Sequence, residues 1–227
     1  MPLLGTAAML LSFDIAPEAV HEHDDWHTHE HLPERLAIPG FLRGTRWVAV
    51  SADTPRYLVL YEVQSLQTLA SPAYLARLNQ PTPWTAKMMP HYRGMRRGLC
   101  DVAGSQGLGS GPWGLLTRFT PAPGAEPALQ GWLQQTLMPT LPQRPGLGSV
   151  HLLQGALAPP MTQEQRIRGA DAGVDWALLC TGYEPGALQA LAAAELHPQA
   201  LAAQGALQVS QGHYQAHYTL GADERVV

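Results

Sequence analysis

The chain is poor in several residue types, and each shortage excludes a class of protein. Its 227 residues include two cysteines, Cys100 and Cys180, and a single lysine, Lys87. Two cysteines do not form a disulfide framework, so the fold has to rest on an apolar core. Charged residues make up 14% and the net charge is −4, which excludes both a disordered polyelectrolyte and a basic surface for nucleic acid or anionic lipid.

The sequence also shows no pattern typical of a signal peptide or of a membrane-spanning segment. No apolar run approaches the roughly 18 residues that a bilayer span requires. The apolar segment 1–13 has no basic residues before it, unlike a signal peptide. We therefore expect a cytoplasmic protein without nucleic-acid or membrane partners.

Known catalytic and cofactor motifs are missing as well. The sequence has no nucleotide-binding glycine pattern, no serine-hydrolase elbow and no paired-cysteine metal knuckle. No cofactor is required by any motif, which leaves the cofactor unknown and a metal or haem possible.

What the chain does have is an internal repeat. Three segments occur in the same order twice: a Pro-Gly turn, an apolar strand and a final His-Tyr strand. In the first half they are 38–41, 57–61 and 90–94, and in the second half 144–147, 176–180 and 212–216. Ordered agreement of this kind predicts two like units fused in one chain.

The order of expected elements identifies the unit. Strands are predicted at 8–15, 41–51, 57–63 and 91–99, with helices over 18–36 and 66–78 between them. Pro33 should end or kink the first helix near Leu32. The same order recurs over 113–119, 125–140, 148–157, 175–183, 186–196 and 208–220, with 159–173 expected as an extra loop. This βαββαβ order is ferredoxin-like, and it predicts an α+β protein with repeats at 1–103 and 113–221, a linker at 104–112 and a tail at 222–227.

One segment resembles a known family. Residues 25–36, Asp-Trp-His-Thr-His-Glu-His-Leu-Pro-Glu-Arg-Leu, are followed by Ile-Pro-Gly-Phe-Leu-Arg-Gly at 38–44. This pattern resembles EthD-like proteins of the dimeric α+β barrel superfamily, in which an aromatic residue, Glu-His, Pro and a Pro-Gly turn recur. The second half departs from it, because Leu-Met-Pro-Thr-Leu-Pro stands at 137–142.

The resemblance implies a fold more firmly than a reaction. It implies that the two ferredoxin-like sheets pack into one α+β barrel within the chain, with a pocket between each sheet and its helices. Members of the superfamily include monooxygenases acting on aromatic polyketides, haem-degrading enzymes, chlorite dismutases and lactone isomerases, so fold alone does not decide chemistry.

Five histidines within 21–31 suggest two kinds of chemistry. On a helix, His23, His27 and His31 share a face and can reach one divalent metal ion; the alternative is a solvated histidine-rich face. His31, with Glu30 before it, occupies the position of the family's Glu-His pair. It is a candidate proton carrier, or else it tethers the end of the helix.

The remaining candidates would line a pocket. Strand alternation places His91 and Arg93 on one face, with His213 as the repeat counterpart of His91; in the alternative reading this polar row faces water. Aromatic side chains could wall the same pocket or simply fill the core. The candidate pocket residues are Trp26, Trp47, Tyr61, His91, Arg93 and His213.

Three functions fit these residues. The first is an enzyme, with a monooxygenase-like or isomerase-like degradative activity on a small apolar or aromatic compound bound in the first repeat. The others are a non-catalytic small-molecule-binding or accessory protein and a metal-binding protein, in each case as a monomeric pseudo-dimer or a homodimer. A pocket too small for a ring, or a His31 that points into solvent, would contradict the first.

Overall fold

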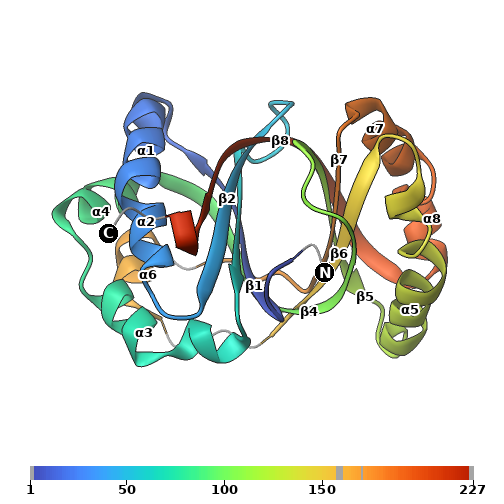
Figure 1. The fold of residues 1–227 in the computed structure, drawn as a ribbon, viewed down its shortest axis with the longest axis horizontal. Helices are drawn as coiled ribbons and strands as arrows, with labels where there is room; N and C mark the ends of the chain where they lie inside the picture. The colour runs from blue at the N-terminus through green and yellow to red at the C-terminus, as the bar shows by residue number, and fades with distance from the viewer. Residues whose placement is uncertain (1–2, 157–160, 170, 225–227) are drawn as a thin grey trace.

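Eight antiparallel strands close into a barrel, and helices cover it on two opposite sides (Figure 1). The computed structural model describes residues 3–156, 161–169 and 171–224. The strands are β1 (Ala7–Ile15), β2 (Phe41–Ala49), β3 (Tyr57–Val63), β4 (Tyr92–Gly107), β5 (Trp113–Pro121), β6 (Leu147–Gly155), β7 (Trp176–Gly182) and β8 (Ala206–Gly221). The predicted α+β barrel is confirmed.

The two halves of the barrel have the same strand order. The first half contributes β4-β1-β3-β2 and the second contributes β8-β5-β7-β6. Two antiparallel seams join them, β2 with β8 and β4 with β6. Each half is thus a ferredoxin-like sheet whose edges are covered by the edges of the other, which leaves no open strand edge in the barrel.

The helices repeat in the same way. The first half carries α1 (Val20–Trp26), α2 (Leu32–Leu36), α3 (Pro72–Asn79) and α4 (Pro83–Met88), and the second carries α5 (Glu126–Trp132), α7 (Pro185–Ala193) and α8 (Pro198–Ala203). A five-residue π-helical turn follows α1 at His27–His31 and α5 at Leu133–Leu137. Short 3-10 turns lie at Pro17–Ala19, Leu66–Ala70, Met89–His91, Leu141–Gln143 and Ala222–Glu224.

One helix breaks the symmetry, and the sequence did not predict it. Residues 159–173 were expected as a loop, but α6 (Gln163–Arg168) lies within them. Its first turn is held by a capping box, in which the side chains of Thr162 and Gln165 each bond to the other's backbone. Although α6 follows β6 in the second half, it contacts α3 and the Met89–His91 turn of the first half (Figure 1).

Two further expectations were wrong in detail. Residues 104–107, expected as linker, extend β4, because they pair with β6 as far as Gly107 and Ser149. A β-bulge around Gly94, whose φ is +60°, shifts the register of β4 against β1. The bulge reverses the alternation, so Tyr92 is buried on the same side as Met95, whereas Arg93 is exposed. Of the expected tail, 225–227 lie outside the described residues.

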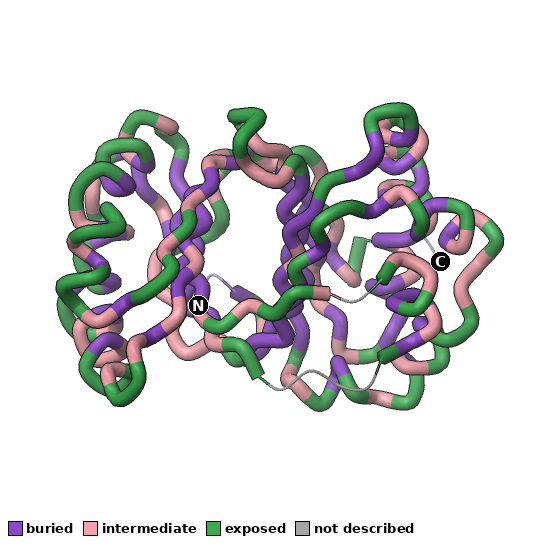
Figure 2. The backbone as a smooth tube through the Cα atoms, turned by 180° about the vertical axis from the view of Figure 1, so that it is seen from behind, coloured by how far each residue is buried: buried purple, intermediate pink, exposed green. Residues whose placement is uncertain are grey.

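Three apolar cores hold these layers together. Buried residues follow the strands of the barrel, and many exposed residues lie on the outer helices and loops (Figure 2). One core lies between the strands and helices of the first half, and a second lies in the same place in the second half. The third draws residues from all eight strands, including Leu10, Trp47, Leu116 and Tyr214, and therefore fills the barrel interior. Burial of apolar area, at about 25 cal/mol per Å², is the main stabilising contribution in each.

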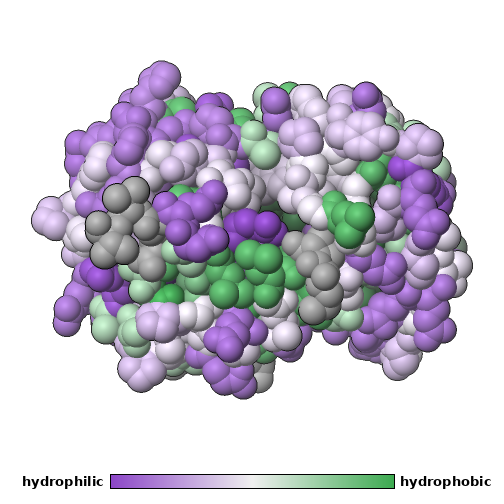
Figure 3. Space-filling view, viewed as in Figure 1, coloured by the Kyte–Doolittle hydropathy of each residue, from purple (hydrophilic) through white to green (hydrophobic). Residues whose placement is uncertain are grey.

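The outer surface is mostly polar over the helices (Figure 3). Apolar residues gather between the two helical layers, over the barrel, on the face drawn in Figure 3. None of the helices in the described residues has the length and apolar character needed to cross a membrane.

The turn between the first helix and the second strand of each half requires glycine. Gly146 has φ +87°, and a Cβ there would lie 2.5 Å from Ala187 Cβ. We expect Gly146→Ala to lower the free energy of unfolding by about 1–2 kcal/mol for the left-handed backbone and about 1–3 kcal/mol for the overlap. Gly124→Ala is the control, because Gly124 has φ +81° but nothing within 4 Å of its Cβ position. Equal losses in urea denaturation would contradict the packing argument.

Candidate functional site

The π-helical turn His27–His31 places three histidines against the first sheet. The amide of Leu32 donates to the carbonyl of His27, five residues earlier, which inserts one extra residue into the helix. Pro33 follows at the start of α2 and has no amide to continue the ordinary pattern. His23, His27 and His31 consequently all point inward and are 0%, 1% and 7% exposed. The predicted common face is confirmed.

The second half has leucines where the first half has these histidines. Counting from the π-helical turns, His23, His27 and His31 correspond to Leu129, Leu133 and Leu137, and all three leucines are buried. Trp26 and Pro33 correspond to Trp132 and Pro139. Since leucine fills the same positions in the same fold, packing does not require histidine there.

The histidines are buried with incomplete hydrogen bonding. His23 Nδ1 lies 3.3 Å from Asp24 Oδ1, and His27 Nε2 lies 3.4 Å from the Tyr61 hydroxyl. The Nδ1 atoms of His27 and His31 are buried without a hydrogen-bond partner. Burial, together with Arg35 nearby, holds the pKa of His31 well below its usual range, and burial with His23 and Arg46 nearby does the same to the pKa of His27. Both imidazoles are therefore neutral at pH 7 and can accept a proton.

His31 opens onto a small cavity, which we call the first-half pocket. Its sheet and helix walls carry Met9, Leu11, His31, Arg35, Tyr61, Tyr74, Leu78 and Arg97, and its outer wall is α6 with the preceding residue, through Thr162, Glu164, Gln165 and Arg168. Arg97 is 8% exposed and its Nη2 donates to the Tyr74 hydroxyl at 3.1 Å. Among the described residues no carboxylate pairs with Arg97, so the pocket holds a buried positive charge beside a neutral histidine.

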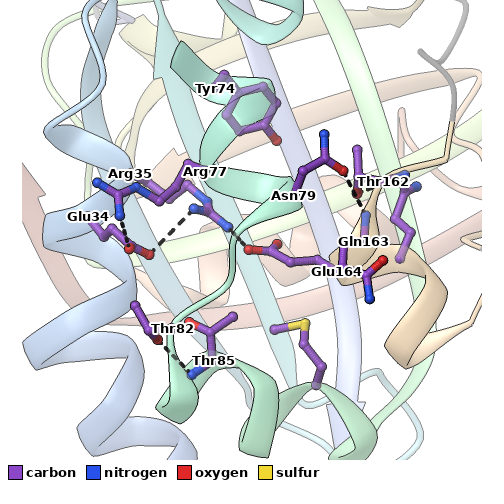
Figure 4. A network of polar contacts seen from close by, with 12 residues as sticks. Glu34, Arg35, Tyr74, Arg77, Asn79, Thr82, Thr85, Thr162, Gln163 and Glu164 are labelled. Atoms are coloured by element: carbon purple, nitrogen blue, oxygen red, sulfur yellow. Dashed lines mark hydrogen bonds and ion pairs between the residues drawn. The ribbon is translucent and has the colours of Figure 1, made fainter. Parts of the chain in front are cut away.

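Ion pairs and capping contacts hold α6 over the pocket (Figure 4). Arg35 Nη2 lies 2.5 Å from Glu164 Oε1, and both residues are almost fully buried. Burial lowers the pKa of Arg35, but the charge of Glu164 outweighs it, so the pKa of Arg35 is raised overall. The amide of Gln163 donates to Asn79 Oδ1 at 3.1 Å. The carboxylate that pairs with Arg35 thus comes from the other half of the chain.

With α6 in this position the pocket is nearly full. The cavity measures about 30 Å³, which is room for one water molecule. Pockets for drug-sized ligands measure roughly 300 Å³ or more, so neither an aromatic ring nor a porphyrin fits this conformation. Across the described ranges, no group of three or more His, Cys, Asp or Glu side chains could hold a metal ion. The three imidazoles pack against the Trp26 ring instead of converging on one point.

Glu30 acts on the site from a distance. Its Oε1 accepts hydrogen bonds from the Trp26 indole at 3.1 Å and from the Thr82 hydroxyl at 2.5 Å. Thr82 in turn caps α4 (Figure 4). Trp26 lies against His31, with ring centroids 4.3 Å apart. Glu30 therefore positions Trp26, and through it His31, and does not line the pocket.

The other predicted pocket residues are dispersed. Tyr61 lines the pocket and Trp26 supports it, but Trp47 belongs to the core of the barrel interior. Arg93 is exposed and its Nη1 donates to the carbonyls of Pro90 and Tyr92. His91 and His213 are half-buried and do not line the first-half pocket. They are not repeat counterparts as predicted, because His91 ends the turn before β4 whereas His213 lies in the middle of β8. The prediction for Arg93 was wrong because it assumed regular strand alternation from 91 onward. The bulge at Gly94 interrupts that alternation and turns Arg93 to the outside.

Four important residues were missed. Tyr74, Arg97, Glu164 and Arg168 line the pocket without having been singled out as site residues. A local pattern could have placed Glu164 on a helix. Thr-Gln-Glu-Gln at 162–165 is a capping-box pattern, which is typical of the first turn of a helix. Nothing in the sequence indicates that this helix crosses to the other half.

Comparison with solved structures agrees with this architecture. An anthrone oxidase-like protein superimposes with a TM-score of 0.66 at 17% identity, over 100% of this chain and 98% of the other. A proposed monooxygenase from Fusobacterium nucleatum gives 0.62 at 10% identity, over 96% of each chain. Another, from Lactobacillus acidophilus, gives 0.58 at 8% identity, over 95% of this chain and 96% of the other. No family model and no curated protein matches the sequence.

The chain has the dimeric α+β barrel fold. Identities of this size show the fold alone, and the resemblance to EthD-like proteins stays a prediction. One fold can host many unrelated functions, so the chemistry has to be argued from the pocket.

Proposed function

We propose that the chain is an enzyme that oxidises a small aromatic compound bearing an acidic C–H group, with the first-half pocket as its active site. The exchange of His23, His27 and His31 for leucine in the second half carries this proposal. A buried polar group without a partner costs about 1–3 kcal/mol. The first half bears that cost at Nδ1 of both His27 and His31, although leucine would pack there equally well.

His31 is the proposed base. It is neutral at pH 7, its Nδ1 has no partner, and Trp26 fixes the plane of its ring. An acidic C–H placed in the pocket would transfer its proton to this nitrogen. General-base assistance of this kind contributes about 10²–10⁴-fold to a rate.

Arg97 is the proposed stabiliser of the anion that proton removal leaves. A buried guanidinium without a carboxylate is costly in a resting protein, and the cost is recovered when a negatively charged group binds beside it. The Tyr74 hydroxyl, which accepts from Arg97, keeps the guanidinium turned toward the pocket.

The closed cavity of about 30 Å³ is too small for a ring, which contradicts an enzyme whose pocket is rigid. The proposal therefore requires α6 to move when the substrate enters. Four of the lining residues, Thr162, Glu164, Gln165 and Arg168, belong to α6 or directly precede it. Displacing this one short helix would open the pocket along its outer wall. Its return would exclude water from the deprotonated substrate.

Anthrone is the probe for the reaction, since the solved structure with the TM-score of 0.66 is of an anthrone oxidase-like protein. Its C10 methylene would lose one proton to His31, and the carbanion would react with O2. One oxygen atom of O2 becomes the new carbonyl, the other leaves as water with both methylene hydrogens, and anthraquinone is formed. The carbon loses four electrons and O2 gains four.

The decisive variant is His31→Leu, which copies Leu137 of the second half. We expect anthrone-dependent O2 uptake above the spontaneous rate to fall at least about 100-fold, while the melting temperature is kept or raised. His29→Leu is the matched control, because His29 is exposed and bonds to the carbonyl of Asp25. Unchanged uptake in His31→Leu would refute the assignment of the base. Tight binding of anthrone without any uptake would favour the non-catalytic binding function.

A further inference from the structure

A second cavity lies at one end of the barrel and shares no lining residue with the first-half pocket. It measures about 250 Å³ and is bounded by β4, β5, β8 and the segment 173–175. Its polar side chains include Arg96, Arg118, Gln208 and Ser210, and its apolar wall includes Phe119 and Trp176. The proposed oxidation uses none of these residues.

Arg118 reaches across the barrel. Leu116 of β5 belongs to the core of the barrel interior, and Arg118 follows two positions later on the same face. Its Nη1 donates to Ser12 Oγ on β1 at 3.2 Å. In the strand order of the closed barrel, β1 and β5 lie opposite each other. The guanidinium therefore spans the barrel mouth and cannot easily turn away into solvent.

This mouth carries uncompensated positive charge. Burial, and then the nearby Arg96, lower the pKa of Arg118. Neither arginine has a carboxylate at ion-pair distance among the described residues. The one carboxylate in the lining is Asp175, whose Oδ2 accepts from the Thr120 hydroxyl at 2.6 Å. Two guanidinium groups and one carboxylate leave a single net positive charge, which matches a monoanion better than a dianion.

A strained backbone lies at the same place. Gln208 has φ +51° and is the only residue other than glycine with a positive φ in the described parts of the chain. A β-bulge accounts for this backbone, because β8 shifts its register against β5 between Leu207 and Ser210, as β4 does against β1 around Gly94. Phe119 and Trp176 meet edge to face, with ring centroids 6.1 Å apart, and the half-buried Trp176 ring is the apolar group that lies open to the cavity.

We propose that this cavity binds a small organic monocarboxylate. Arg118 and Arg96 hold the carboxylate, and Trp176 packs against its apolar part. A carboxylate accepts from guanidinium groups in a planar, two-pronged geometry, which makes it a better ligand here than a spherical anion.

Benzoate is the probe, titrated by calorimetry against the full chain at low salt. We expect saturable binding to one site that weakens at least 10-fold in Arg118→Gln and in Arg96→Gln. Arg144→Gln is the control, because Arg144 pairs with Glu195 away from the cavity, and it should bind benzoate as the unaltered chain does. Benzylamine, which has the same ring but a positive charge, should not bind.

Circular dichroism establishes that each variant is folded, and Arg96→Gln decides the question if Arg118→Gln does not fold. Absence of saturable benzoate binding to the unaltered chain would overturn the proposal. Equal affinity in a folded Arg118→Gln or Arg96→Gln variant would do so as well. The titration measures binding without turnover. Its outcome therefore does not depend on whether the anthrone oxidation assay succeeds or fails.

Discussion

Replacing Arg35 with methionine is expected to lower the free energy of unfolding by about 3–5 kcal/mol. The guanidinium is 1% exposed and lies 2.5 Å from Glu164, which is itself 3% exposed. Removing one partner of a buried ion pair leaves the other charge in a medium that cannot solvate it. Urea denaturation of Arg35→Met measures the loss.

The double variant Arg35→Met, Glu164→Met tests the cause. Methionine has a similar volume and no charge, so the double variant should recover most of the lost stability. Arg77→Met is the surface control, because Arg77 is 44% exposed where it pairs with Glu34, and pairs of that kind contribute about 0–1 kcal/mol. If the losses at Arg35 and Glu164 simply add, the two residues do not act as a pair.

The second large effect is on acid stability. His151 is 1% exposed inside the barrel, where Ser105 bonds to its Nδ1 at 3.0 Å and Ser149 to its Nε2 at 3.1 Å. Burial, with Arg43 nearby, lowers the pKa of His151 to about 3. Below pH 6.5 the unfolded chain takes up a proton that the folded chain refuses, so stability falls as the pH falls. The loss from this one residue is about 1.4 kcal/mol per pH unit, or about 2 kcal/mol between pH 6.5 and 5.

Three more histidines act in the same direction, because burial also lowers the pKa of His23, His27 and His31. Glu34 and Glu62 act in the opposite direction, since burial raises their pKa. Their effect begins at the ordinary carboxyl pKa and extends upward from it, so it offsets part of the histidine effect at the acid end of this range. Denaturation of His151→Asn at several pH values isolates one residue. Its stability should fall less steeply than that of the unaltered chain between pH 6.5 and 5. Parallel curves would show that His151 takes up its proton equally in the folded and the unfolded chain.

The internal repeat could be predicted from the sequence because its turns and strands are determined by residues close together in the chain. Pro39-Gly40 and Pro145-Gly146 both form the turn that a positive φ at glycine permits, with φ +93° and +87°. Apolar runs at 57–63 and 176–182 became central strands, since both of their faces are buried. The order of such elements is enough to specify a ferredoxin-like half.

The site was only partly readable, because it depends on contacts between distant segments. His31 and Tyr61 lie close to one another through adjacent elements of one half, and the helical spacing of the histidines made their common face predictable. Glu164 reaches Arg35 from 129 positions away, and no local pattern encodes that approach. One residue of bulge at Gly94 was enough to misplace Arg93.

The fusion of two halves has a consequence for how such a protein can change. In a barrel assembled from two identical chains, every mutation appears at both symmetric positions, so any cost to packing is incurred twice. Here histidine can enter one cavity while leucine stays in the other, and the stable half compensates for the polar one. The strand-to-strand segment that carries α6 goes further, because one half supplies the cover for its neighbour's cavity. Two identical chains cannot evolve such a division of labour, because each substitution would appear in both.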